Sequence, residues 1–181
     1  REGNSAQAER VYREIIAATP EFDPAYHALG LLAYENKQAN LAIDLINHAI
    51  EINDDVLLYQ SNLCEILRLN GRLEDALEVG TNAVSKAPEN VIAHYNLALT
   101  LADSGQINDA IASYQRILEL DPGHTLAWNN LGAALETIGD KANAKRAYQY
   151  AIASGGKHAE SHNNLAALLT EAGELETAIK H

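Results

Sequence analysis

An asparagine column is the feature of this sequence most suited to binding chemistry. Asparagines recur every 34 residues, each directly before a leucine, at Asn62, Asn96, Asn130 and Asn164. A primary amide both donates and accepts hydrogen bonds. A regular row of amides is therefore suited to hold the backbone of an extended peptide without reading its side chains.

Apolar and acidic residues accompany the column on helix sides that the predicted core does not use. At about 100° per residue, this side lies roughly 130° from packing residues such as Trp128 and Leu131. Apolar residues outside a core often mark a partner site. Besides the asparagine column, the predicted peptide-binding residues are Leu31, Tyr34, Leu58, Glu65, Ile92, Tyr95, Leu99, Leu126, Asn129, Glu136 and Asn163.

The charges predict the chemistry of the partner. The chain has 13 Lys+Arg and 25 Asp+Glu, a formal charge of −12, and acidic residues border the predicted site at Glu35, Asp103, Glu160 and Glu171. We therefore expect a protein or peptide partner with basic and apolar side chains, whose approach the acidic border accelerates. Nucleic acid is not expected, because phosphate binding needs clustered Lys and Arg.

Catalytic and cofactor patterns are not found. The sequence has no phosphate-binding loop and no GxGxxG, HExxH, GxSxG or CxxC motif. Cys64 falls in a column of small residues and is predicted to pack. The stretch 53–55 lacks the alternating ligands of a calcium loop, and of His158 and His162 the first falls in a predicted turn. We predict no enzyme, no cofactor and no metal.

Pairs of helices must position these residues, because the whole chain aligns with itself at an interval of 34. Gly105 is expected to end one helix and Pro122 the next, since Gly tolerates the left-handed conformation past a helix end and Pro cannot continue the hydrogen-bond ladder. Two helices cross at close range where a side chain is small. One small column comprises Ala8, Ala42, Ala76, Ala110, Ala144 and Ala178.

The stretch 125–158 resembles the tetratricopeptide repeat family, because Trp128, Leu131-Gly132, Ala144, Tyr148 and Ala151 have the spacing of that signature. The resemblance implies an all-α fold, an α-solenoid of antiparallel helix pairs forming a right-handed superhelix. It also implies that the first helix of each pair lines a concave face. The expected organisation is a single array over 1–181, with a half repeat at 1–22, full repeats at 23–56, 57–90, 91–124 and 125–158, and a partial repeat at 159–181.

The asparagine column is also similar to the ladder lining the tetratricopeptide domain of O-linked N-acetylglucosamine transferases. Asn-Asn-Leu at 129–131 and 163–165 adds to the likeness. Asparagine is common in this column across tetratricopeptide proteins generally, where it bonds between neighbouring helices. The ladder therefore has two open roles, in ligand binding and in helix packing.

The predicted function is a protein–protein interaction scaffold that binds a peptide or protein segment in the concave groove. The alternative is the substrate-recognition arm of a larger enzyme such as a glycosyltransferase, and self-association through uncapped ends is a third hypothesis. The chain opens at Arg1 and contains no Met, so we expect a piece of a longer protein. No stretch approaches the roughly 18 apolar residues of a membrane span, and a cytoplasmic location is the expectation.

Overall fold

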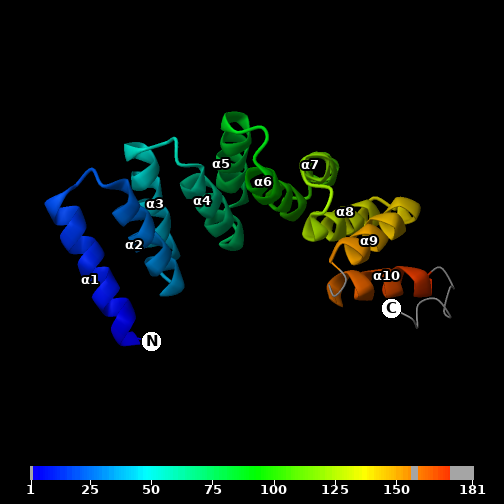
Figure 1. Cartoon of the computed structure of the whole chain (residues 1–181), viewed down its shortest axis with the longest axis horizontal. Helices are drawn as coiled ribbons and strands as arrows, with labels where there is room; N and C mark the ends of the chain where they lie inside the picture. Colours follow the sequence, from blue (N-terminus) through cyan, green and yellow to red (C-terminus); the bar gives the residue numbers. More distant parts are fainter. Residues whose placement is uncertain (1, 156–158, 172–181) are drawn as a thin grey trace. The chain divides into compact units, whose positions relative to one another are not determined.

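Helices account for nearly all of residues 2–155 and 159–171, which are the residues that the computed structural model describes (Figure 1). Over these residues no strand occurs, and none of the helices is both long and apolar enough to cross a bilayer. The helices are α1 (Glu2–Ala18), α2 (Asp23–Glu35), α3 (Ala39–Ile52), α4 (Leu57–Leu69), α5 (Leu73–Lys86), α6 (Val91–Asp103), α7 (Ile107–Leu120), α8 (Thr125–Thr137), α9 (Lys141–Gly155) and α10 (Ala159–Glu171).

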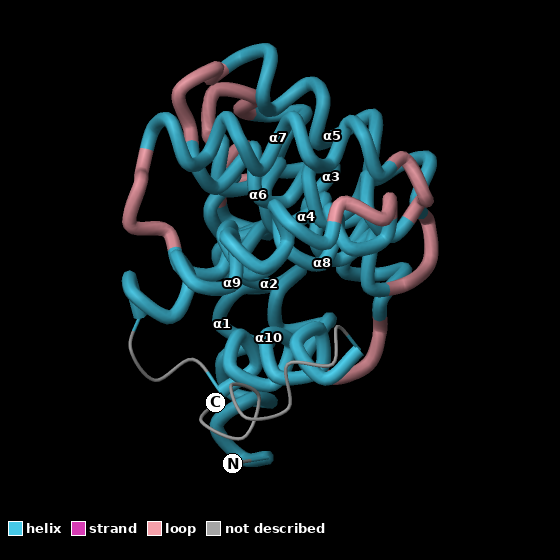
Figure 2. Tube along the Cα trace, turned by 90° about the vertical axis from the view of Figure 1, so that its right-hand side faces the viewer, coloured by secondary structure: helices cyan, strands magenta, loops and turns pink. Residues whose placement is uncertain are grey.

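The helix bounds follow the period of the sequence. The first helices α2, α4, α6, α8 and α10 begin at 23, 57, 91, 125 and 159, and the second helices α3, α5, α7 and α9 begin at 39, 73, 107 and 141. Each first helix before α10 is followed after a three-residue turn by its second helix, and such short connections join antiparallel neighbours (Figure 2). The fold is an all-α helical repeat solenoid, as predicted.

The chain divides into two compact units. Unit 1 comprises residues 1–87 with α1 to α5, and unit 2 comprises residues 88–181 with α6 to α10. Within unit 1, α2 packs against α3 and α4 against α5. Within unit 2, α6 packs against α7 and α8 against α9, and α10 packs against α9.

Small residues allow the helices of each pair to approach closely. The alanine column is fully buried at Ala42, Ala76, Ala110 and Ala144; Ala178 lies outside the described residues. Gly132 faces the ring of Tyr148 so closely that a Cβ at residue 132 would lie 2.5 Å from Tyr148 Cε1. The periodic small residues are therefore required by helix contacts.

The turns between first and second helices share one backbone geometry. Gly71, Gly105 and Gly139 have φ of 75°, 79° and 83°, which confirms the expectation that Gly105 ends a helix in the left-handed conformation. Lys37 occupies the same position with φ 64°. In that turn Lys37 N donates to Tyr34 O and Gln38 N to Ala33 O, at 3.0 and 2.9 Å, which is the Schellman pattern.

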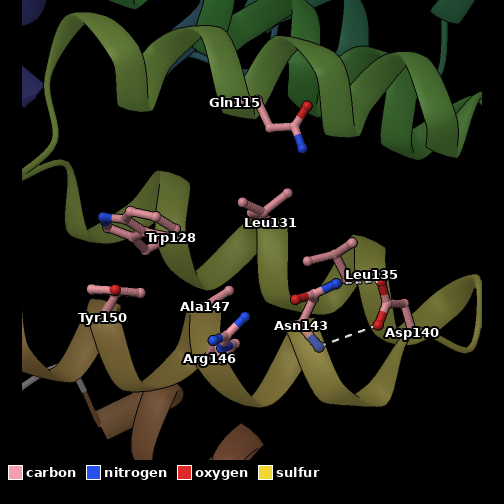
Figure 3. A pocket seen from close by; sticks show the side chains of 9 residues that line it. All are labelled: Gln115, Trp128, Leu131, Leu135, Asp140, Asn143, Arg146, Ala147 and Tyr150. Carbon is pink, nitrogen blue, oxygen red and sulfur yellow. Dashed lines mark hydrogen bonds between the residues drawn. The ribbon is translucent and has the colours of Figure 1, made fainter.

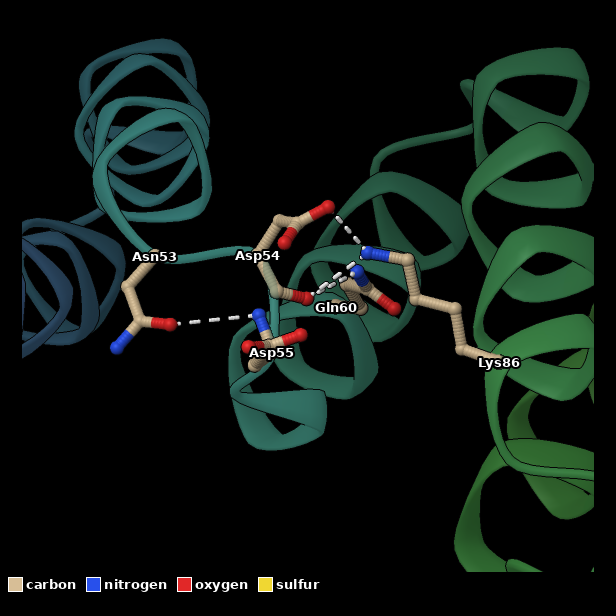
Figure 4. A network of polar contacts seen from close by, with 5 residues as sticks. All are labelled: Asn53, Asp54, Asp55, Gln60 and Lys86. Carbon is tan, nitrogen blue, oxygen red and sulfur yellow. Dashed lines mark hydrogen bonds and ion pairs between the residues drawn. The ribbon is translucent and has the colours of Figure 1, made fainter.

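The acidic stretch between α3 and α4 is a hydrogen-bonded turn (Figure 4). The Asp54 carboxylate pairs with Lys86 Nζ at 2.6 Å, and the Asp54 carbonyl accepts from Lys86 Nζ and from Gln60 Nε2. Asp55 N donates to Asn53 Oδ1. The turn is thus bonded to α4 through Gln60 and to α5 through Lys86, all within unit 1.

Candidate functional site

The structure places every predicted contact residue on a first helix. We call the side of α2 and α4 that carries Leu31, Leu58, Asn62 and Glu65 the unit 1 face. The unit 2 face is the side of α6, α8 and α10 that carries Ile92, Asn96, Leu126, Asn130 and Asn163. Each face combines apolar side chains, amides and carboxylates.

Exposed apolar residues recur at the same point of three first helices. Leu58, Ile92 and Leu126 are each the second residue of their helix, and they are 56%, 61% and 43% exposed. About half of the surface of each side chain is therefore open to water and accessible to a partner. Covering the exposed part of each side chain would contribute roughly 1 kcal/mol, about half of the value for a side chain that is fully exposed before it is buried.

The apolar part of each face is narrower than predicted. Leu31 and Tyr34 are half-buried and pack against a core cluster that includes Leu63 and Leu67. The expectation that the core does not need Leu31 and Tyr34 is thereby corrected. Leu99 is also half-buried.

The aromatic member of the unit 2 face is held by other rings. Tyr95 is half-buried, and its ring lies 6.5 Å from that of Tyr114 and 5.2 Å from that of His124, measured between centroids. These contacts fix the ring on α6.

The asparagine column connects neighbouring first helices within each unit. Three side-chain amides reach back to the preceding first helix: Asn62 Nδ2 lies 2.8 Å from His27 Nε2, Asn130 Nδ2 donates to Tyr95 OH at 3.1 Å, and Asn164 Nδ2 donates to Asn129 Oδ1 at 3.1 Å. Every bond joins residues 35 apart, so the column repeats one contact. Of the two roles left open by the sequence, ligand binding and helix packing, the NH2 groups of these three asparagines serve helix packing.

Asn129 is the predicted contact residue that the fold encloses. Its side chain is 1% exposed, and Asn129 Oδ1 also accepts from Ser161 Oγ at 3.0 Å. This placement corrects the expectation of an accessible Asn129. Helical spacing alone puts Asn129 on the free side of α8, but the polar residues of α10 pack over it.

Carboxylates lie on the first helices of both units. On the unit 1 face, Glu35 and Glu65 are exposed and have no hydrogen-bond or ion-pair partner among the described residues. On α8, Glu136 accepts a 2.9 Å hydrogen bond from Tyr148 OH. Burial, and then this hydrogen bond, raises the pKa of the Tyr148 phenol.

The groups considered for other chemistry are placed as follows. Cys64 is 1% exposed and its Sγ donates to Ala76 O at 3.4 Å, which confirms the prediction of a packing residue. Among residues 2–155 and 159–171 no group of three or more His, Cys, Asp or Glu is placed to hold a metal ion. His158 lies outside the described residues.

Family comparison agrees with this architecture. Three family models described as "Tetratricopeptide repeat" match residues 23–56, 67–135 and 130–181. These matches together span most of the chain, and the helix pairs recur at the interval of that repeat. The chain therefore belongs to the tetratricopeptide repeat family, whose stacked repeats present binding surfaces to other proteins.

Solved structures share the fold at low sequence identity. PilF of Pseudomonas aeruginosa has a TM-score of 0.83 at 20% identity, over 99% of this chain and 82% of PilF. MamA from Desulfovibrio magneticus RS-1 has a TM-score of 0.77 at 16% identity, and the match covers 96% of this chain and 90% of MamA. YrrB, described as a tetratricopeptide protein with an unusual peptide-binding site, has a TM-score of 0.75 at 19% identity. The match covers 88% of this chain and 82% of YrrB.

These comparisons establish the family but relate the chain to no particular protein within it. A search of curated protein sequences finds no match. The resemblance to the arrays of O-linked N-acetylglucosamine transferases is not shown, and the alternative of a substrate-recognition arm is not favoured.

Proposed function

We propose that the chain is an interaction scaffold whose first-helix faces bind a peptide or protein segment with basic and apolar side chains. The observation that carries this proposal is the exposed apolar column of Leu58, Ile92 and Leu126. In a stable repeat array, bulky apolar residues repeatedly left in water are best explained by a partner that covers them.

Charge supports the basic character of the partner. The free carboxylates of Glu35 and Glu65 lie on the unit 1 face, and the whole chain carries −12. Basic side chains beside apolar ones therefore gain favourable contacts at the rim and faster association. Asn62 Oδ1 and Asn164 Oδ1, which have no partner among the described residues, supply acceptors for a peptide backbone N–H.

The test uses fluorescein-labelled peptides of about twelve residues composed of Lys, Leu and Ser, with a twin in which Gln replaces Lys. Fluorescence anisotropy should show binding of the Lys peptide and much weaker binding of the Gln twin. Leu58→Ser should weaken binding to the unit 1 face. The double variant Ile92→Ser with Leu126→Ser should weaken binding to the unit 2 face. We expect a loss of about fivefold for Leu58→Ser and about twentyfold for the double variant, since each half-exposed side chain contributes roughly 1 kcal/mol.

Matched controls carry the same change at exposed apolar residues elsewhere. Leu41 on α3 is 40% exposed and Ile138 after α8 is 49% exposed. Leu41→Ser and Ile138→Ser should leave the affinity unchanged. Equal binding of the two peptides, or equal losses in face and control variants, would contradict the proposal.

A further inference from the structure

A cleft of about 410 Å³ opens within unit 2, between α7, α8 and α9. Gln115 of α7 forms one side, Leu131 of α8 lies at its base, and Asn143, Arg146 and Tyr150 of α9 form the other side (Figure 3). None of these residues belongs to the unit 2 face. The volume lies at the lower end of the roughly 300–1,000 Å³ found for small-ligand pockets, so it suits a few side chains.

An aromatic pair forms one wall of the cleft. The Trp128 indole stacks on the Tyr150 ring, with 4.7 Å between centroids and 23° between planes. Trp128 Nε1 donates to Pro122 O at 2.9 Å, which fixes the orientation of the indole. The Tyr150 side chain is 56% exposed. A rigid aromatic surface at the edge of a cleft favours contact with an apolar ligand group.

The corresponding place in unit 1 is closed. Three intervals earlier, Tyr26 and His48 occupy the positions of Trp128 and Tyr150, but their rings meet edge-on, at 4.4 Å and 65°, and the void lined by Leu29 and Leu41 measures only about 10 Å³. Leu41 lines that void where unit 2 has Asn143. Asn143 in place of a leucine is one difference between the open cleft and this smaller void.

The cleft also carries one uncommitted cation. Arg146 is exposed and has no hydrogen-bond or ion-pair partner among the described residues. The one carboxylate of the lining, Asp140, is already engaged, since it accepts from Asn143 Nδ2 at 2.8 Å and from Asn143 N at 3.2 Å. Arg146 lies between this pair and the aromatic wall (Figure 3). A guanidinium in that position favours a carboxylate partner.

We propose that this cleft is a second binding site, for a short peptide in which an acidic side chain precedes an aliphatic one. The carboxylate pairs with Arg146, and the aliphatic side chain rests on Leu131 beside the Trp128–Tyr150 stack. The ligand charge is opposite to that proposed for the first-helix faces. The two sites therefore succeed or fail independently.

Trp128 makes the test direct, because the chain contains one tryptophan. The probe is an acetylated, amidated peptide Gly-Ser-Glu-Leu-Ser-Gly, which has no aromatic residue. Its twins carry Lys in place of Glu, or Gly in place of Leu. Titration should change Trp128 fluorescence saturably with the Glu-Leu peptide, and each twin should bind about tenfold more weakly, as expected for loss of a charge-assisted hydrogen bond or a buried aliphatic group.

Variants locate the binding. Arg146→Gln should lower the affinity for the Glu-Leu peptide about tenfold. The control Arg116→Gln, at an arginine of α7 that pairs with Glu119, should leave this affinity unchanged. Asn143→Leu restores the residue of the closed repeat and should abolish the signal. Circular dichroism melting shows whether each variant is folded.

Any one of four results would overturn the second site. The first three are equal affinity of the Glu-Leu and Lys-Leu peptides, an unchanged affinity in Arg146→Gln, and a signal that persists in Asn143→Leu. Loss of the signal in Leu126→Ser would place the peptide on the unit 2 face and would also exclude the cleft.

Discussion

Lys37 is held in a conformation that three glycines adopt at the same turn position. The left-handed region costs an L residue about 1–2 kcal/mol, and glycine avoids this cost but loses part of the gain through its larger unfolded-state entropy. We expect Lys37→Gly to raise the free energy of unfolding by about 0.5–1 kcal/mol, measured by urea denaturation. Lys37→Ala keeps the Cβ and should change stability little; a gain equal to that of glycine would exclude backbone strain as the cause.

His27 makes the stability of unit 1 depend on pH. Its side chain is 8% exposed, and burial lowers the pKa of His27 below 6.5. The native state therefore favours the neutral ring. Its contribution to stability is complete above pH 6.5 and is lost as the pH falls through the lower native pKa.

Urea denaturation at several pH values tests this dependence. Between about pH 7.5 and 5 the wild type should lose more stability than His27→Gln, because the variant lacks the ring that titrates. Carboxylates titrate in both proteins and cancel in the difference. Identical pH profiles would show that His27 is not responsible.

At the scale of helix pairs, α8 and α9 are closer than a side chain at residue 132 permits. An added Cβ would lie 2.5 Å from Tyr148 Cε1, in a ring that is 1% exposed and bonded to Glu136. We expect Gly132→Ala to lower the free energy of unfolding by about 1–2 kcal/mol, since overpacking outweighs the better helix propensity of alanine.

The same repeat position holds Ala98 in α6, which is fully buried beside its own second helix. Ala98→Gly should also destabilise, by about 1 kcal/mol, because there the alanine already fits. Thermal melting compares the two variants. Stabilisation by Gly132→Ala would mean that Tyr148 moves aside without cost.

The bonds of the asparagine column are a property of paired first helices. Asn130→Ala removes the bond from α8 to Tyr95 of α6 and should cost about 1 kcal/mol in chemical denaturation. Asn163→Ala, at an exposed amide of α10, should cost little. Equal losses of stability in the two variants would contradict a role in packing. Because Asn130→Ala is expected to destabilise the fold, peptide binding to the faces is tested at Leu58, Ile92 and Leu126 instead.

At the scale of the whole chain, net charge governs association. With −12 on the chain, affinity for the basic-apolar peptide should fall about three- to tenfold between roughly 0.05 and 0.5 M NaCl, as screening shortens the range of the attraction. A twin with Ser in place of Lys should respond much less. Anisotropy titrations that show equal salt dependence would argue against electrostatic recognition.

The fold was predictable because its determinants are local or periodic. The glycines at turn positions, the alanine column and the interval of 34 set helix bounds that the structure reproduces. The exposed leucines of the faces were predictable for the same reason, since helical spacing alone separates Leu58 and Leu126 from the core.

Tertiary structure decided what depends on contacts between helices far apart in sequence. Asn129 is enclosed because residues of α10 lie over it, and Leu31 is partly used by the core because it packs against the cluster that α3, α4 and α5 build. The cleft beside Trp128 arises from the volumes of side chains on three helices at once. Sequence periodicity sets which side of a helix a residue occupies, whereas only packing determines whether that side is covered.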